Sequence, residues 1–362
     1  MTPERTRTGL RTGYTTGACA AAAAKAAALM LRNVKAPEEV SLLLPAGKWA
    51  TFVVASAASD GHEAMCGVIK DAGDDPDVTN GAEIRATVRG TEDGGIAIDG
   101  GEGVGVVTKA GLELPVGSAA INPTPRKMIE AAVCEAAGSD SRGFHVTISV
   151  PGGEEIAKRT LNARLGVMGG ISIIGTTGIV VPMSHSAYTS CISLALDVAV
   201  AAGCREAVLT TGRRTELFAM RMLDLPQESF VEMGDFVGFA LDACRKRGFR
   251  RVTVAAMIGK MTKIAAGYMQ THADSAPQSL EGLIAIARET GANEGVAVEL
   301  AAAGTAREVG EIITRAGLTD VFGRLCAEAH AACAARLGPK TGLRVLLCGF
   351  EGELWGHAGE KF

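Results

Sequence analysis

The segment 70–81, KDAGDDPDVTNG, combines clustered carboxylates with glycine, proline and asparagine. Four aspartates fall within seven positions: Asp71, Asp74, Asp75 and Asp77. Neighbouring like charges disfavour ionisation, so such a cluster can supply a general base near neutral pH. Asp and Asn side chains also cap their own turns. An EF-hand starting at Asp75 is excluded, because Asn80 and Ala86 stand where glycine and glutamate are required. Spacing alone therefore leaves two interpretations of the aspartate cluster open: a general base, or a turn that its own side chains cap.

The tripeptide Thr-Thr-Gly occurs at 15–17, 176–178 and 210–212. The last two copies follow strand-like segments and precede helix-like ones. In an open α/β sheet, ligands bind outside the carboxyl ends of strands, where glycine lets the backbone approach closely. We therefore predict a nucleotide-like cofactor across these two loops, although ordinary strand-to-helix turns favour the same residues. The predicted cofactor contacts, including carboxylates near the next strand end, are Gly175, Thr176, Thr177, Gly178, Thr211, Gly212, Glu232 and Asp235.

Charged side chains near these loops could hold an anionic ligand. Arg213 follows the third Thr-Thr-Gly copy, and Lys260 lies on a predicted helix that follows a strand. Arginine suits carboxylates because its guanidinium binds them in a bidentate manner. His185 lies near a predicted helix start and could donate a hydrogen bond from a neutral imidazole. Each of these residues could also be an ordinary solvated surface residue, which is the more common case for such side chains.

The elements that must position these residues begin with an Ala-rich helix, expected from Thr15 or Thr16 to about Arg32, since threonine caps helices and alanine favours them. Short β-rich segments separated by Gly, Pro and Asp follow, which indicates mostly antiparallel strands. A second helix is expected from Pro125 to a stop at Gly138. This half of the chain has the pattern of an α+β domain.

The pattern changes near residue 166 to alternating strands and helices. ISIIG (171–175) is a continuous apolar run, typical of a parallel strand buried on both faces. The sequence thus predicts two domains: a strand-rich α+β domain over 1–165, and a mostly parallel, doubly wound α/β domain over 166–362, which we expect to bind the cofactor.

Composition narrows the functional class. The net charge of −4 and the aromatic content of 4% disfavour nucleic-acid binding. Nine scattered cysteines without a CxxC pair indicate reduced, buried thiols and no metal site. Lys25 interrupts the apolar run that would resemble a secretory signal, and no stretch is long enough to span a membrane. We expect a cytoplasmic protein, with self-association left open.

Several long strings occur in a fixed order: LRTGYTTGACAAAAAKAA, VIKDAGDDPDVTNGAEI, GVGVVTKAGLELPVGSAAINPTPRKMI, GGISIIGTTGIVVPMS, IGKMTKIAAG and GFEGELWG. Together they resemble the cobalt-precorrin-5B C1-methyltransferase family (CbiD) of cobalamin biosynthesis, nearly end to end. The resemblance implies methyl transfer from S-adenosylmethionine to C1 of cobalt-precorrin-5B, a ring-contracted tetrapyrrole, giving cobalt-precorrin-6A. His185 and Ser186 depart from the acidic residues expected after PMS, and TTGRR departs from the PGN expected after the next strand.

The resemblance gives the candidate residues specific roles. Asp71, Asp74 and Asp75 become the candidate catalytic group, as a general base or as partners of pyrrole N–H groups. We expect these aspartates to line a cleft between the two domains, where a flat substrate would fit. The substrate's peripheral carboxylates require cations. The expected substrate contacts are Arg11, Thr15, Thr16, Arg126, His185, Arg213 and Lys260.

Two other functions stay as alternatives. A nucleotide-dependent phosphotransferase would hold phosphates on the Gly-rich turns, but the chain lacks a Walker sequence. A non-catalytic tetrapyrrole-binding protein would change the visible spectrum of an added corrinoid without yielding a methylated product.

Overall fold

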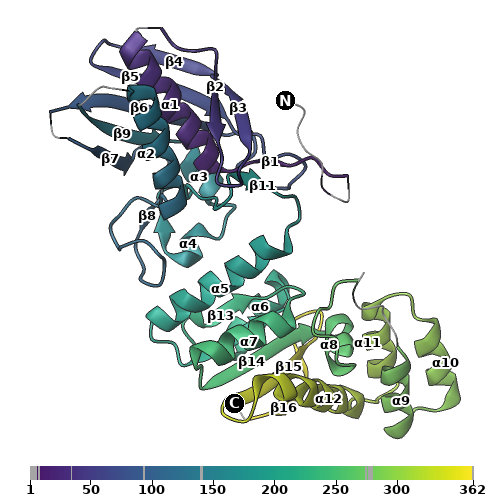
Figure 1. Cartoon of the computed structure of the whole chain (residues 1–362). Coiled ribbons are helices and arrows are strands. Elements are labelled where there is room, and N and C mark those ends of the chain that lie inside the picture. The colour runs from purple at the N-terminus through teal and green to yellow at the C-terminus, as the bar shows by residue number, and fades with distance from the viewer. Residues whose placement is uncertain are drawn as a thin grey trace. The chain divides into compact units, whose positions relative to one another are not determined.

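The computed structural model places the chain in two compact units, Met1–His185 and Ser186–Phe362 (Figure 1). It describes residues 6, 9–33, 35–92, 94–138, 142–273, 275 and 280–360. The boundary lies later than the predicted one at residue 165, because the segment in between pairs with strands of the first unit. There β10 (Val167–Met168) pairs with β8 (Val106–Val107), and β11 (Ile179–Val180) pairs with β1 (Gly13–Tyr14).

The first unit is built on a five-stranded sheet in the order β4-β5-β6-β9-β7. All neighbours are antiparallel except β7 and β9. Buried side chains alternate along β6, because successive residues of a strand point to opposite faces. A separate hairpin joins two further strands. The strands are β2 (Glu39–Leu43), β3 (Trp49–Val53), β4 (Ser56–Ser59), β5 (Glu63–Ile69), β6 (Glu83–Thr91), β7 (Ile96–Gly100) and β9 (Gly143–Ser149).

Two helices, α1 (Thr16–Asn33) and α2 (Pro123–Ala137), lie side by side over this sheet (Figure 1). Every residue of α1 from Thr16 to Ala28 is buried. Alanine side chains are small enough for neighbouring elements to approach this helix on all sides. The predicted Ala-rich helix is therefore confirmed, while α2 begins slightly before the predicted Pro125. Two short helices complete the unit: α3 (Gly153–Ala157) and α4 (Asn162–Leu165).

The predicted strand at 171–175 of the second domain is wrong. Ile171 and Ile173 are 1% and 0% exposed, but they belong to the core of the first unit. Their backbones make isolated bridges to Val104 and Ile121. A continuous apolar run indicates burial, but it does not identify the core in which the run is buried.

The second unit contains a five-stranded sheet in the order β13-β12-β14-β15-β16. The first four strands are parallel, as the alternation predicted, and β16 is an antiparallel edge strand that was not predicted. The mixed α/β class is thus confirmed. The strands are β12 (Glu206–Thr210), β13 (Phe230–Glu232), β14 (Arg251–Met257), β15 (Gly342–Cys348) and β16 (Leu354–Gly359).

Helices cover both faces of this parallel sheet. On one face, α6 (Arg213–Met222) packs against Val208 and Leu346. On the other, the helices that follow β13 and β14 pack against Leu209 and Val345. The helices after the neighbouring strands β12 and β14 therefore lie on opposite faces. The remaining helical elements are α5 (His185–Ala201), η1 (Gln227–Ser229), α7 (Val237–Arg247), α8 (Ile258–Ala265), α9 (Glu281–Glu289), α10 (Glu294–Ala302), α11 (Ala306–Arg315) and α12 (Asp320–Leu337).

Within the described part of the chain, no helix is long and apolar enough to cross a membrane. No group of three or more His, Cys, Asp or Glu side chains among the described residues could hold a metal ion. All nine cysteines are free, and Cys134 and Cys191 are exposed rather than buried as predicted. Burial raises the pKa of Cys19 to about 12, which keeps this thiol protonated.

Candidate functional site

Segments that are far apart in sequence meet at the N-terminal end of α1. The backbone of β1 lies directly against the acidic loop, 71–77, where the Tyr14 N–H donates to the Asp71 carbonyl at 2.7 Å. A Cβ on Gly13 would lie 2.0 Å from the carbonyl carbon of Ala72, so glycine is required for this approach. The structure thus places the first motif of the sequence beside the second.

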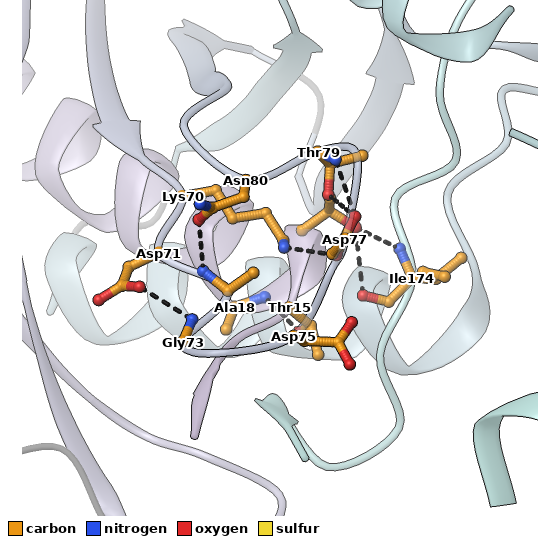
Figure 2. A network of polar contacts seen from close by, with 12 residues as sticks. Thr15, Ala18, Lys70, Asp71, Gly73, Asp75, Asp77, Thr79, Asn80 and Ile174 are labelled. Atoms are coloured by element: carbon orange, nitrogen blue, oxygen red, sulfur yellow. Dashed lines mark hydrogen bonds and ion pairs between the residues drawn. The ribbon is translucent and has the colours of Figure 1, made fainter. Parts of the chain in front are cut away.

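The acidic loop is held by ion pairs and hydrogen bonds rather than by solvation alone (Figure 2). Asp71 makes a bidentate salt bridge with Arg11, and its Oδ1 also accepts from the Gly73 N–H at 2.9 Å. The hydrogen bond from Arg11 is the largest influence on Asp71 and lowers its pKa. The expected mutual repulsion of carboxylates therefore does not govern Asp71, which stays ionised through its arginine partner.

Asp74 and Asp75 are less fully engaged. The Arg11 backbone N–H donates to Asp74 Oδ2 at 2.6 Å. The Met183 N–H donates to Asp75 Oδ1 at 2.9 Å, while no described residue donates a hydrogen bond to Asp75 Oδ2. Met183 has a φ of 54° and is the single non-glycine residue with positive φ in the described chain. Asp75 thus keeps one carboxylate oxygen for a ligand.

The buried Lys70 and the half-buried Asp77 form an ion pair that the sequence prediction missed. Lys70 Nζ lies 2.7 Å from Asp77 Oδ2, and the lysine side chain is 1% exposed (Figure 2). Asp77 Oδ1 accepts from the Thr79 N–H and hydroxyl at 2.8 and 2.7 Å, as the turn interpretation expected. Burial raises the pKa of Asp77, but the bonds from Lys70 and Thr79 outweigh it and lower the pKa overall.

Three predicted substrate contacts are engaged inside the first unit. Thr15 Oγ1 accepts from the Ala18 N–H at 3.2 Å, as a helix cap. Thr16 Oγ1 accepts from the Ile174 N–H at 2.8 Å. Arg126 donates to two backbone carbonyls, at 2.8 and 2.9 Å. These contacts position α1 and α2, so they support a structural function for Thr15, Thr16 and Arg126.

The predicted cofactor loop 175–178 also belongs to the first unit. A Cβ on Gly175 would lie 2.3 Å from the hydroxyl oxygen of Thr15, and the Gly178 carbonyl accepts from the Thr15 N–H. Thr176 and Thr177 are exposed. The premise that this loop and 210–212 follow strands of one sheet is therefore wrong.

In the second unit, predicted residues meet at the carboxyl ends of β12, β13 and β14. Lys260 Nζ lies 2.9 Å from Asp235 Oδ1 and donates to the Thr211 carbonyl at 3.1 Å. Thr271, which was not predicted, donates from its hydroxyl to Asp235 Oδ1 at 2.7 Å. Burial raises the pKa of Asp235, but hydrogen bonds from Thr271 and Lys260 outweigh burial and lower it. Lys260, on the helix that follows β14, thus contacts the segments that follow β12 and β13. The helices after β12 and β14 lie on opposite faces of the sheet, so the strand connections diverge at this point.

Tyr188 is a further residue of this cluster that the sequence prediction missed. Its ring lies 5.2 Å from that of Phe236, and a Cβ on Gly234 would lie 2.5 Å from its hydroxyl oxygen. Burial, with the charges of Glu232 and Asp235, raises the pKa of Tyr188 to about 12. The scarcity of aromatic residues, at 4% of the chain, was the signal that could have found it.

The other predicted contacts lie near the starts of helices. Gly212 caps α6, and Arg213 Nη1 lies 2.5 Å from the buried Glu216. His185 is exposed and is the first residue of α5. A separate cavity of about 350 Å³ opens between α11 and the segment 350–355, and none of the predicted site residues lines it.

The fold and these two clusters define a two-unit α/β protein. One unit carries the acidic loop, and the other carries acidic and basic side chains at the carboxyl ends of its parallel strands. The CbiD family model matches residues 3–182, and the model of the CbiD C-terminal domain matches residues 270–359. The chain belongs to the CbiD family.

Relatives named cobalt-precorrin-5B C(1)-methyltransferase match most of the chain. The protein from Geobacillus kaustophilus is 50% identical over 83% of this chain and 80% of its own length. That from Thermus thermophilus is 48% identical over 96% of this chain and 94% of its own length. The crystal structure of a cobalamin biosynthesis protein (cbiD) from Archaeoglobus fulgidus is 27% identical, covers 85% of both chains and has a TM-score of 0.39.

Proposed function

We propose that this protein transfers a methyl group from S-adenosylmethionine to C1 of cobalt-precorrin-5B. The observation that carries the proposal is the match to methyltransferases of that name, which for the Thermus thermophilus protein is 48% identical over 96% of this chain. The site chemistry is compatible with it. Methyl transfer from a sulfonium is an in-line displacement, in which aligning the reactants contributes on the order of 7–11 kcal/mol.

Asp75 is the best candidate among the predicted catalytic aspartates. Its Oδ1 is fixed by the Met183 N–H, while no described residue donates to its Oδ2. That oxygen can accept a proton or a hydrogen bond from a pyrrole N–H of the substrate. We assign Asp71 a supporting function, because its carboxylate is paired with Arg11. Asp74 is an intermediate candidate, since one of its oxygens accepts a hydrogen bond from the Arg11 backbone N–H.

We propose that the methyl donor binds at the carboxyl ends of the parallel strands in the second unit. Ligands of open α/β sheets bind where the strand connections diverge, here between β12 and β14. Lys260 uses two of its three N–H groups on Thr211 and Asp235, which leaves one for the donor's carboxylate. Glu232 lies at the end of β13, where a carboxylate can accept hydrogen bonds from ribose hydroxyls.

Incubation with labelled S-adenosylmethionine and cobalt-precorrin-5B, followed by mass analysis of the corrinoid, tests the reaction. A product that has gained one methyl group supports the proposal. A corrinoid that changes the visible spectrum on binding but is never methylated would point to a carrier instead. Calorimetry with S-adenosylhomocysteine tests the donor separately. No binding, with or without substrate, would contradict the assignment of S-adenosylmethionine as the methyl donor.

A further inference from the structure

The ion pair between the buried Lys70 and the half-buried Asp77 spans the acidic loop. Lys70 directly follows β5, and Asp77 is the last of the four aspartates. The pair therefore joins the two ends of the segment that carries Asp71, Asp74 and Asp75. Backbone hydrogen bonds hold Lys70 on the other side, from its N–H to the Ala82 carbonyl and from the Gly81 N–H to its own carbonyl.

Stability is a weak explanation for this pair. Removing an ammonium and a carboxylate from water costs free energy, which their attraction repays only with good geometry. Apolar residues in the same place are often as stable, so a buried pair can instead serve to fix one conformation. Lys70 is 1% exposed, and its charge has one described side-chain partner, Asp77 at 2.7 Å.

We propose that Lys70 is a positioning residue for methyl transfer: through Asp77 it holds the acidic loop in the conformation that presents Asp74 and Asp75 to the substrate. Figure 2 shows the Lys70 side chain extending across the loop to Asp77, while the Asp75 carboxylate points away from this pair. This inference rests on the proposed function. The buried ammonium does not itself touch the substrate, so it acts only through the loop.

The test compares variants that break or remove the pair. Lys70→Met leaves the half-buried Asp77 carboxylate without its cation. The double variant Lys70→Met/Asp77→Asn has no unpaired charge, and the asparagine oxygen can still accept from the Thr79 N–H. Lys25→Met is the matched control, because Lys25 is 8% exposed and is also paired with a carboxylate, Glu135 at 2.7 Å, but lies on α1 away from the loop. Thermal unfolding, kcat and KM are measured for each.

We expect Lys70→Met to unfold at a lower temperature, and the double variant to regain most of this loss. The kcat of the double variant should stay at least tenfold below wild type, with KM for S-adenosylmethionine unchanged, because the loop has lost the ion pair that spans it. Lys25→Met should lose stability but keep its kcat. A double variant with wild-type kcat would overturn the inference and leave the pair a structural feature.

Two further outcomes can also be interpreted. If the double variant does not fold, Lys70→Arg keeps the charge with altered geometry; a lowered kcat at unchanged KM supports positioning, and wild-type kcat contradicts it. If the wild-type protein yields no methylated corrinoid at all, the proposed function fails, which the same assay shows independently of any variant.

Discussion

Asp75→Asn separates catalysis from folding at a single carboxylate. The side chain has two oxygens with different surroundings: Oδ1 accepts from the Met183 N–H at 2.9 Å, and Oδ2 accepts from no described residue. Asparagine keeps an oxygen for Met183 and replaces the other with an amide. The substitution therefore removes the charge and the acceptor at the proposed substrate-facing position, while the loop contact persists.

The expected magnitudes differ for the two properties. Replacing a charged acceptor by a neutral one weakens the bond to Met183 by about 1 kcal/mol, which is the expected loss of stability. Loss of a general base or of a charged acceptor lowers kcat by roughly 10²–10⁴, or about 3–5 kcal/mol of activation free energy. Activity should thus fall far more than stability.

The assay is methyl transfer to cobalt-precorrin-5B under saturating substrates, alongside thermal unfolding. Asp60→Asn is the matched control: Asp60 Oδ1 accepts from the backbone N–H groups of His62 and Glu63 at 2.8 and 2.9 Å, in a turn of the same unit outside the loop. It should keep wild-type kcat. A kcat for Asp75→Asn within twofold of wild type would refute the assignment of Asp75 and leave its contact with Met183 as its only function.

Three other outcomes are expected. Gly13→Ala should destabilise the protein by roughly 1–3 kcal/mol in denaturant unfolding, because its Cβ would lie 2.0 Å from the Ala72 carbonyl carbon; Gly282→Ala, in a helix with nothing within 4 Å, should instead stabilise by about 0.5–1 kcal/mol. Lys260→Met should weaken S-adenosylhomocysteine binding about tenfold or more in calorimetry, or about 1.4 kcal/mol, and unchanged affinity would remove Lys260 from the donor site. The pKa of Asp77 is lowered in the folded protein, so its contribution to stability is present above the unfolded pKa of about 4 and is lost as pH falls through the folded value. The difference in melting temperature between wild type and Asp77→Asn should therefore shrink as pH falls below about 4, and a constant difference would contradict this.

Local patterns predicted most elements, because helix caps, alanine content and strand punctuation act over a few residues. The helix α1 and the parallel strands of the second unit follow from such patterns. The run at 171–175 failed for the opposite reason. Its burial was correctly indicated, but Ile171 and Ile173 pack in the first unit through bridges to residues more than fifty positions away. Periodicity carries no information about which distant segment is the partner.

The same limit applies to the site. The density of aspartates at 71–77 identified the acidic loop, but the lowered pKa of Asp71 depends on Arg11, which precedes it by 60 residues. Lys70 carried no signal of its own, because a lysine after a strand is usually solvated. Its burial became visible only with its partner in place. The pKa of each carboxylate, and whether it is free to bind a ligand, depend on which charged residues lie beside it in space. The sequence alone does not determine these neighbours.

The Ala-rich helix α1 reverses the usual pattern of mutational tolerance. Most buried helices are weakened by trimming large side chains, but Ala18 to Ala24 are each 0% exposed with little left to remove. Added volume is the change this helix cannot absorb. A saturation library over residues 18–24 should therefore keep alanine, glycine and serine and lose larger residues, even apolar ones. The close approach of neighbouring segments around α1 makes side-chain size, rather than polarity, the property under selection at these positions.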